Sequence, residues 1–540
     1  MKSYIIGVDV GGTHIDAVLL KDGKVQEFLK RPYQRDMITE SIQSILVQIL
    51  SKLDVDEIER IQLSTTITTN TVAQKTGDKV DLILMSPGLK HDFSHLDAKI
   101  HYLDGYVNHQ GEVVTEFDEN ALHKIEKNLA QTNNLGIIGK FSVRNSVHEL
   151  KVKEYFRDKV NFITMGHKLS GKLNFKRRVE TVYLNNYVYR MFLPFAREVQ
   201  STLRTLGVKT PVYILKADGG TILLDEAILK PVETIMSGPA ASYMGMKALL
   251  SQSGDGILMD IGGTTTDVFF VVDGTPLFEP KGISIGSYKT LIRSIYSFSL
   301  PLGGDSKVVR NNGIYEFENR TGFAAGFGGD DPTVTDALVI LGNMEAKAPE
   351  ASFEAISKLD LSKNVELVAL EVVGTFVENL RISIYKNIDL VNSRPRFTIK
   401  EVLENKQFEP TFIQTIGGPS LGLNPHLQNV FGLKVTSPKE YAFANALGAA
   451  LSEPTAEVSI IANTRRGVVV VPEFSIERRI DRHYTLEDAI QLACDLLKIE
   501  DIDIVEASQY NMVSYFGTLE KNIRVVAQVK PRLIDEWRCD

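Results

Sequence analysis

The feature that most constrains this chain is a short pattern of two aspartates, two glycines and a threonine that occurs twice between apolar segments. Residues 4–20 read YIIGVDVGGTHIDAVLL, and residues 256–272 read GILMDIGGTTTDVFFVV. Each copy is predicted to form a strand, a glycine turn and a returning strand, because β-branched and apolar residues flank the turn. Glycine has no Cβ, so the backbone of such a turn can approach a polyphosphate and direct several N–H groups at it.

One copy alone would also fit an ordinary hairpin whose glycines only permit a positive φ. Two copies with the same spacing indicate a duplicated architecture, in which two hairpins face one polyphosphate across a cleft. An aspartate at the end of a strand can hold Mg²⁺, in particular through water, or orient an attacking oxygen. Four aspartates of the two copies remain candidates for the general base: Asp9, Asp16, Asp260 and Asp267.

Two polar segments are candidates for contacts with a substrate. Thr65, Thr66 and Asn70 lie in a threonine-rich bend that leads from a strand into a helix. They either line a pocket or cap the helix, and the sequence favours neither. Ser237 and Gly238 begin a helix that precedes the second hairpin, so the free N–H groups at its start can contact an anion. Ordinary capping is an equally good explanation there.

A further glycine pair, Gly417-Gly418, follows an apolar strand predicted at 411–416 and precedes a helix. This arrangement lets a nucleotide base and ribose lie against the backbone. Other helices are predicted at 175–206, at 441–451, where small residues favour close packing, and at 486–497, from their apolar spacing. Histidines 91, 95, 101 and 109 cluster in the sequence, but their loop-like surroundings favour a metal site only weakly.

The composition excludes several classes of protein. The 540 residues carry a net charge of −8 and no block of basic residues, which argues against a nucleic-acid surface. The two cysteines are not in a Cys-x-x-Cys pattern, so disulfide frameworks, zinc–thiolate sites and iron–sulfur clusters are disfavoured. No apolar run has the length of a membrane span, and no signal region precedes Tyr4. We therefore expect a cytoplasmic protein of two to four domains without a membrane segment.

The chain is identified as a member of the hydantoinase and 5-oxoprolinase family, A-type subunit, within the actin, sugar-kinase and Hsp70 ATPase superfamily. The resemblance covers about residues 4–460, and the motifs that carry it occur in the family's order: GVDVGGTHIDAVL, STTITTN, DGGTI, MSGPAAS, MDIGGTTTDV, DPTVTDA and IGGPS. It implies an α/β fold of duplicated actin/hexokinase-like (ribonuclease H-like) subdomains around a nucleotide cleft. We expect an N-terminal domain at 1–170, an ATPase domain at 171–460 and a small α+β appendage at 461–540.

The resemblance also implies an ATP-dependent hydrolase that phosphorylates the carbonyl of a small cyclic amide, such as 5-oxoproline or a hydantoin, so that water can open the ring. ATP and Mg²⁺ are the implied cofactors. Six residues would bind phosphates, Gly417 and Gly418 would border adenosine, and Asp9 and Asp260 would hold Mg²⁺ or steer the nucleophile. The six are Gly11, Gly12, Thr13, Gly262, Gly263 and Thr264.

The chain departs from the family pattern where a substrate is expected. Leu63-Ser64 precede the threonine pair in place of His-Gly, and the stretch after Gly166-His167 is basic rather than acidic and proline-bearing. Many relatives work with a separate B-type subunit, so such a partner is expected, and a homo-oligomer stays open. Two alternatives remain: the ATPase subunit of an acetone-carboxylase-like complex, and a non-catalytic, nucleotide-gated binding protein of the actin or Hsp70 kind.

Overall fold

The computed structural model describes residues 4–12, 14–32, 38–86, 88, 91–129, 134–279, 281–394, 407–499, 501–513 and 519–534. The chain divides into two compact units. Unit 1 comprises Met1–Ala240, Glu279–Ser294 and Ala449–Arg538, and unit 2 comprises Ala241–Phe278, Ile295–Gly448 and Cys539–Asp540. The predicted boundaries at 170 and 460 stay predictions.

The first sheet of unit 1 contains the first hairpin. Its six strands have the order β12-β11-β4-β1-β2-β3. Strand β1 is antiparallel to β2 and parallel to β4, which is itself parallel to β11. Helices α1 and α6 pack on this sheet, and side chains such as Ile45, Ile61 and Phe195 form a fully buried core between them. The bounds are β1 Tyr4–Val10, β2 His14–Lys21, β3 Lys24–Pro32, α1 Ile38–Leu50, β4 Ile58–Thr65, α6 Phe175–Thr205, β11 Val212–Leu215 and β12 Thr221–Leu223.

A second sheet of unit 1 is entirely parallel, with the order β10-β9-β5-β6. The N-terminal half of α6 covers it with Val179, Val182 and Leu184. The long helix predicted at 175–206 is thus confirmed, and it ends before Gly207, whose φ of 76° suits glycine. The other bounds are β5 Val80–Met85, β6 Ala98–Tyr102, α3 Glu119–Glu126, β9 Asn134–Gly139, α4 Val147–Phe156, β10 Phe162–Met165 and α5 Gly166–Leu169.

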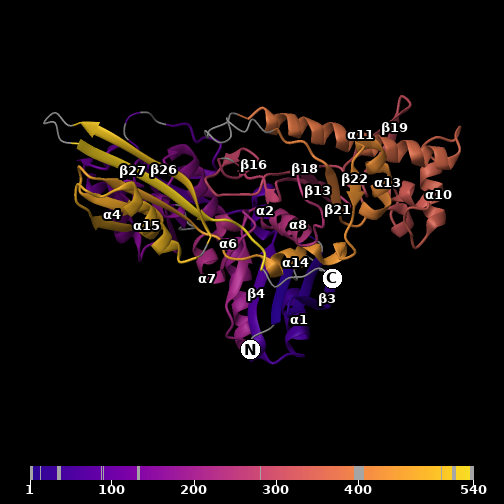
Figure 1. The fold of residues 1–540 in the computed structure, drawn as a ribbon, viewed down its shortest axis with the longest axis horizontal. Coiled ribbons are helices and arrows are strands. Elements are labelled where there is room, and N and C mark those ends of the chain that lie inside the picture. Colours follow the sequence, from indigo (N-terminus) through magenta and orange to yellow (C-terminus); the bar gives the residue numbers. More distant parts are fainter. Residues whose placement is uncertain are drawn as a thin grey trace. The chain divides into compact units, whose positions relative to one another are not determined.

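The C-terminal part of unit 1 is an antiparallel sheet, β25-β24-β23-β27-β26, covered by one helix (Figure 1). Its core combines Val458, Val469 and Val525 of the sheet with Ala489 and Ala493 of α15. The predicted α+β character and the predicted helix at 486–497 agree with this arrangement. The bounds are β23 Glu457–Asn463, β24 Val468–Val471, β25 Ile476–Arg479, α15 Leu486–Leu497, β26 Ile502–Val513 and β27 Leu519–Val529.

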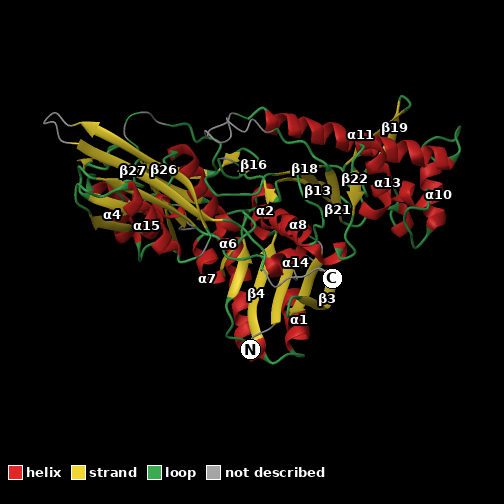
Figure 2. Ribbon diagram, viewed as in Figure 1, coloured by secondary structure: helices red, strands yellow, loops and turns green. Residues whose placement is uncertain are grey.

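The sheet of unit 2 contains the second hairpin. Strand β13 is antiparallel to β14 and parallel to β21, and β21 is parallel to β22. Helices α9, α11 and α13 bury apolar faces against it, and Figure 2 shows α11 as the longest helix of this unit. The bounds are β13 Gly256–Ile261, β14 Thr266–Val272, β18 Ser297–Leu300, α9 Val334–Ile340, α10 Pro349–Ser357, α11 Val365–Asn392, β21 Phe412–Ile416, α13 Ser420–Phe431 and β22 Lys434–Thr436.

The helix predicted at 441–451 begins as a 3₁₀ turn, Tyr441–Phe443, and continues as α14, Ala444–Leu451. It packs against α8, Ser237–Ala248. A Cβ added at Gly245 would lie 1.9 Å from the carbonyl oxygen of Ala444, so only glycine permits this approach. The prediction of close packing by small residues is therefore confirmed.

The two sheets that contain the hairpins have the same topology. In each, the first strand of an antiparallel hairpin is followed on its other side by two strands that run parallel to it. In unit 1 these strands are β2-β1-β4-β11, and in unit 2 they are β14-β13-β21-β22. The predicted duplication of actin/hexokinase-like subdomains is confirmed. Within the described residues, no helix combines the length and the apolar character needed to cross a membrane.

Candidate functional site

Both hairpins have the same register and the same turn. Asp9 is paired with Asp16 across β1 and β2, as Asp260 is paired with Asp267 across β13 and β14. Each turn is closed by one hydrogen bond, from Gly11 N to the carbonyl oxygen of His14 at 3.0 Å and from Gly262 N to that of Thr265 at 2.9 Å. The repeated sequence pattern thus folds into the same local structure twice.

The turn of the first hairpin is open at its second glycine, since no atom lies within 4 Å of a Cβ added at Gly12. Thr13, predicted to bind phosphate, lies outside the described residues. Asp16 accepts a hydrogen bond from Lys30 at 2.9 Å through one oxygen, while the other, Oδ1, is buried and has no hydrogen-bond partner. Burial raises the pKa of Asp16, although the charge of Lys30 opposes this shift. An unpartnered carboxylate oxygen of this kind suits a cation or its bound water.

The candidate substrate residues lie beside this hairpin. Thr66 donates its backbone N–H to the carbonyl oxygen of Val10 at 3.1 Å, and Asn70 donates to Thr66 Oγ1 at 3.2 Å. Thr65 Oγ1 accepts from the N–H of Ile67, the first residue of α2, Ile67–Ala73. The Thr65 hydroxyl therefore accepts a hydrogen bond from the first N–H of the helix, whereas Asn70 is only partly buried.

Ser237 and Gly238 are brought to the same place from far along the chain. Ser237 Oγ donates to the carbonyl oxygen of Thr65 at 2.7 Å. A Cβ added at Gly238 would lie 2.9 Å from Thr66 Cγ2, so the glycine permits close contact between these segments. The five residues predicted from two separate motifs thus form one cluster in unit 1 at the end of β1, and the start of α8 belongs to it.

In the second hairpin, the paired aspartates interact with each other. Ser242 Oγ donates to Asp260 Oδ2 at 2.8 Å. Burial and then the nearby charge of Asp260 raise the pKa of Asp267 to about 6. Two carboxylates this close cannot both ionise without cost, and a bound divalent cation removes that cost.

The turn of the second hairpin is supported by a glycine loop at 302–306. Gly304 N donates to the carbonyl oxygen of Gly262 at 2.9 Å, and Asp305 N to that of Gly263 at 2.8 Å. The Asp305 carboxylate accepts from Thr335 Oγ1 at 3.1 Å and pairs with Arg320 at 3.1 Å. Burial raises the pKa of Asp305 against the effect of that arginine. Asp305 was not predicted as a site residue, and its only signal in the sequence was one more Gly-Gly-Asp motif.

The predicted adenosine-binding pair follows β21 directly, beside the end of β13. Gly417 has a φ of 98°, and a Cβ there would lie 2.2 Å from the carbonyl oxygen of Ile261. The close contact between the ends of β13 and β21 therefore explains why position 417 is a glycine. No atom lies within 4 Å of a Cβ added at Gly418. The turn at Gly262 and Gly263, the exposed Thr264, and Gly418 thus line one edge of the unit 2 sheet.

Among the described residues, no group of three or more histidine, cysteine or acidic side chains is arranged as a metal site. Two of the four histidines that cluster in the sequence instead form separate pairs with acidic residues. His101 pairs with Asp81 at 2.8 Å and His95 with Glu180 at 3.6 Å. The aspartate pairs still fit Mg²⁺, because this ion keeps several waters and commonly takes one or two carboxylates together with substrate phosphates.

Comparison with solved structures defines the class of fold. The crystal structure of ATP-dependent caprolactamase from Pseudomonas jessenii aligns with a TM-score of 0.69 and 18% identity, covering 98% of this chain and 88% of the other. A nucleotide-free acetone carboxylase structure aligns with a TM-score of 0.69 and 15% identity, covering 99% and 88%. At these identities the likeness concerns the fold, which is the α/β fold of the actin/hexokinase-like ATPases.

Family models then place the chain within this class. Residues 5–160 match the hydantoinase/oxoprolinase N-terminal region, and residues 178–458, more than half of the chain, match the hydantoinase/oxoprolinase model. The chain belongs to the hydantoinase/oxoprolinase family.

Two curated relatives have modest identity. The alpha subunit of caprolactamase from Pseudomonas jessenii is 26% identical over 499 residues, which are 84% of this chain and 70% of the relative. The gamma subunit of acetophenone carboxylase from Aromatoleum aromaticum is 24% identical over 463 residues, which are 72% and 62%. This chain thus spans about two thirds of the length of these relatives.

Proposed function

We propose that this protein is the ATP-dependent subunit of an enzyme that phosphorylates the carbonyl oxygen of a small cyclic amide, such as 5-oxoproline or a hydantoin, and so permits ring opening. The observation that carries the proposal is the repeated hairpin, with its paired aspartates and glycine turn in the same register twice. Family membership and the similarity to a caprolactamase subunit support it.

In this proposal the glycine turns direct N–H groups at the phosphates of ATP, and Asp9 and Asp260 hold Mg²⁺, in part through water. Mg²⁺ supplies charge neutralisation on the phosphate oxygens. The lactam oxygen takes the γ-phosphoryl group and ADP leaves. Phosphorylation of the oxygen removes the amide resonance, so water adds to the ring carbon and the C–N bond breaks, with the ring nitrogen leaving as an amine. Hydrolysis of the resulting acyl phosphate releases inorganic phosphate and the carboxylate. Thr66, Asn70 and Gly238, which lie together beside the first hairpin, are proposed to contact the lactam.

A partner subunit that completes the hydrolysis is part of the proposal, because the two curated relatives are themselves named as subunits. A reducing, cytoplasmic location is proposed from the low cysteine content.

A second candidate function is the ATPase subunit of a carboxylase that acts on a ketone, supported by the similarity to acetophenone carboxylase gamma subunit. One experiment separates the candidates: phosphate released from ATP is measured with lactams, hydantoins, and ketones plus bicarbonate. Stimulation by a lactam or hydantoin supports the proposal, whereas stimulation only by a ketone with bicarbonate replaces it with the carboxylase function. Slow turnover that none of these compounds changes would favour a nucleotide-gated binding protein.

A further inference from the structure

A chain of three hydrogen-bonded side chains, separate from both hairpins, lies in unit 1. His167 Nε2 is 3.0 Å from Ser475 Oγ, and His167 Nδ1 is 2.5 Å from Glu149 Oε2. Glu149 lies on α4, His167 on α5, and Ser475 directly after the 3₁₀ turn Pro472–Phe474. The sequence separation between His167 and Ser475 is 308 residues, so no local motif contains them.

The protonation of this chain follows from the partners of Glu149. Its fully buried carboxylate accepts from Gly139 N at 2.8 Å and from His167 N at 3.2 Å. Burial acts to raise the pKa of Glu149, but the charge and hydrogen bonds of its partners, His167 first, outweigh burial and lower it. The ionised carboxylate can only accept, so Nδ1 of His167 carries a proton. In the neutral form of the ring, Nε2 is then the nitrogen that can accept the Ser475 hydroxyl proton. This is the arrangement in which a histidine activates a serine.

The base is held rigidly and the serine is accessible. His167 is fully buried, and its backbone and ring are both fixed by Glu149. Arg178, also buried, donates to the carbonyl oxygens of Gly139, Lys140 and Lys172 around it. Ser475 itself is exposed and has a φ of 53°, in the left-handed region that costs free energy for any residue with a side chain. Strain of this kind concentrates at functional positions.

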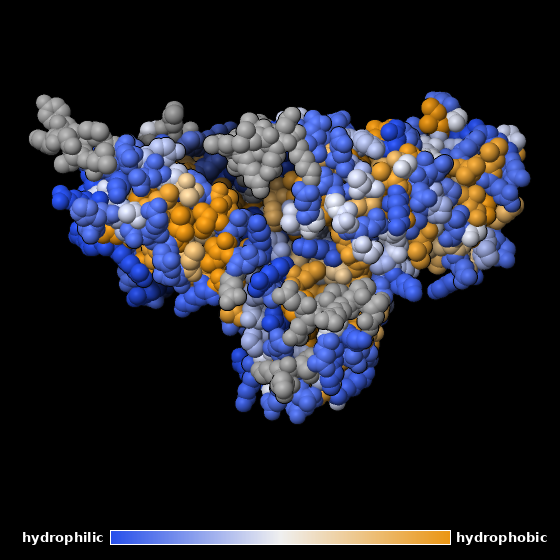
Figure 3. Space-filling view, in the orientation of Figure 1, coloured by the Kyte–Doolittle hydropathy of each residue, from blue (hydrophilic) through white to orange (hydrophobic). Residues whose placement is uncertain are grey.

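A cavity of about 420 Å³ adjoins these segments, a size typical of sites for small ligands. Lys168 and Leu169, which follow His167, and Glu473 and Phe474, which precede Ser475, line it. Phe474 is 49% exposed, and Figure 3 shows hydrophobic residues gathered on the drawn face between the positions that Figure 1 labels α7 (Leu224–Leu229) and α15. Leu169, Ile292 and Phe474 of the lining offer apolar surface to the hydrocarbon part of a ligand, and Ser475 lies next to this lining rather than in it.

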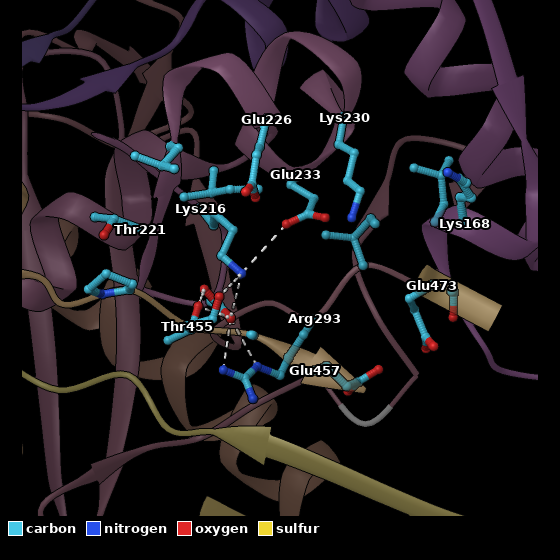
Figure 4. A pocket seen from close by; sticks show the side chains of 18 of the residues that line it. Lys168, Lys216, Thr221, Glu226, Lys230, Glu233, Arg293, Thr455, Glu457 and Glu473 are labelled. Atoms are coloured by element: carbon cyan, nitrogen blue, oxygen red, sulfur yellow. Dashed lines mark hydrogen bonds and ion pairs between the residues drawn. The ribbon is translucent and has the colours of Figure 1, made fainter. Parts of the chain in front are cut away.

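The cavity lining carries charges of both signs, with Asp218, Glu226, Glu233, Glu457 and Glu473 beside four basic residues, and an anionic group of the ligand would have to lie against the basic residues that have no ion pair among the described residues. Lys216 and Arg293 are both paired with Asp218, at 3.6 and 2.8 Å, and Figure 4 shows these pairs as dashed lines. Lys168 and Lys230 also line the cavity, and neither has an ion pair with an acidic side chain in the described part of the chain. Burial, followed by the charges of Lys153 and Lys230, lowers the pKa of Lys168. A carboxylate placed between these ammonium groups would relieve their repulsion.

We propose that Ser475 is the nucleophile of a second, ATP-independent hydrolytic site, with His167 as general base and Glu149 as the positioning residue, acting on small esters that carry a carboxylate. Ser475 Oγ bonds to the ester carbonyl carbon as its proton moves to His167 Nε2. The bond to the alcohol oxygen then breaks, and the alcohol leaves with that proton. Water cleaves the acyl-serine by the same route, so that the acid is released and Ser475 regains its proton.

The nucleophile is tested with a fluorophosphonate probe on the full chain without nucleotide, read by intact-mass and peptide mass spectrometry. One adduct on Ser475 is expected, with none in Ser475→Ala. Glu149→Gln should slow labelling about 100-fold or more, because the ring loses the carboxylate that fixes its tautomer. Ser201→Ala, which removes an exposed hydroxyl of α6, is the matched control and should label at the wild-type rate. Absence of an adduct on Ser475, or wild-type labelling of Glu149→Gln in a protein of unchanged circular dichroism, overturns the proposal.

The substrate class is tested by comparing hydrolysis of the 4-nitrophenyl monoester of glutaric acid with that of 4-nitrophenyl butyrate. The monoester should have the higher kcat/KM. Lys168→Met should reduce the difference in KM between the monoester and the butyrate by about tenfold. Lys153→Met, which removes a neighbouring charge outside the cavity lining, should leave the preference unchanged. Equal turnover of both esters would refute the assignment of an anionic substrate. Because ATP is absent throughout, these results are independent of the function proposed for the hairpins.

Discussion

The paired aspartates of the second hairpin make a quantitative prediction about stability and pH. Asp267 has a pKa of about 6 in the folded chain because of burial and the charge of Asp260, against an ordinary value of 3.8. Between these two values the unfolded chain has released a proton that the folded chain still holds. Stability of unit 2 should therefore fall as the pH rises through this window.

The size of this fall follows from the difference in proton affinity. Since each factor of ten in affinity is worth about 1.4 kcal/mol, the loss is at most about 3 kcal/mol. Asp267→Asn removes this ionising group, so from pH 4 to 8 its stability should fall by up to about 3 kcal/mol less than that of the wild type, and at pH 8 it should be the more stable of the two. Mg²⁺ should stabilise the wild type more at pH 8 than at pH 4, because it binds the ionised pair.

Amide hydrogen exchange of β13 and β14, corrected for the intrinsic pH dependence of exchange, measures the opening free energy of unit 2 without contributions from unit 1. Asp330→Asn, which removes an exposed charge elsewhere in unit 2, is the control and should follow the wild-type curve. If wild type and Asp267→Asn lose protection in parallel as the pH rises, the pKa of Asp267 is not raised in the folded chain and the reasoning is wrong.

Four other substitutions give direct tests. Asp260→Asn should lower lactam-stimulated phosphate release by about 100-fold or more, measured at saturating ATP, because a carboxylate proposed to hold the Mg²⁺ that neutralises the phosphate oxygens is lost. Gly417→Ala should cost about 2 to 4 kcal/mol in urea unfolding, since its Cβ would lie 2.2 Å from the oxygen of Ile261 at a φ of 98°. Gly418→Ala, with open space around it, should cost less than about 0.5 kcal/mol. Asp336→Ala should cost about 3 kcal/mol in the same assay, because its carboxylate accepts from Ala325 N, Gly326 N, Thr333 and Ser352 and forms the capping box of α9.

The elements that could be predicted from the sequence are those whose signal is local. The hairpins depend on strands and a glycine turn within seventeen residues, and α6 and α15 depend on apolar spacing along one helix. Helix α11 carries the same kind of signal in Val368, Val372, Phe376 and Leu380 and could have been predicted, but was missed.

The parts of the site that could not be predicted depend on contacts between distant segments. Asp305 supports the second turn only because the 302–306 loop folds back onto Gly262 and Gly263. Ser237 contacts Thr65, from which it is separated by 172 residues in the sequence. From the sequence alone, helix capping and ligand binding were equally good explanations for each of these two residues. The Glu149, His167 and Ser475 chain depends on the packing of the 3₁₀ turn Pro472–Phe474 against α5, for which no sequence pattern exists.

The central claim is that the aspartate and glycine hairpins are nucleotide-binding elements, and calorimetry with Mg²⁺ and a non-hydrolysable ATP analogue tests it most directly. The wild type should bind the analogue, and Asp9→Asn and Asp260→Asn should each weaken the binding. Absence of binding by the wild type, or an affinity that one of these two substitutions leaves unchanged, would contradict the claim.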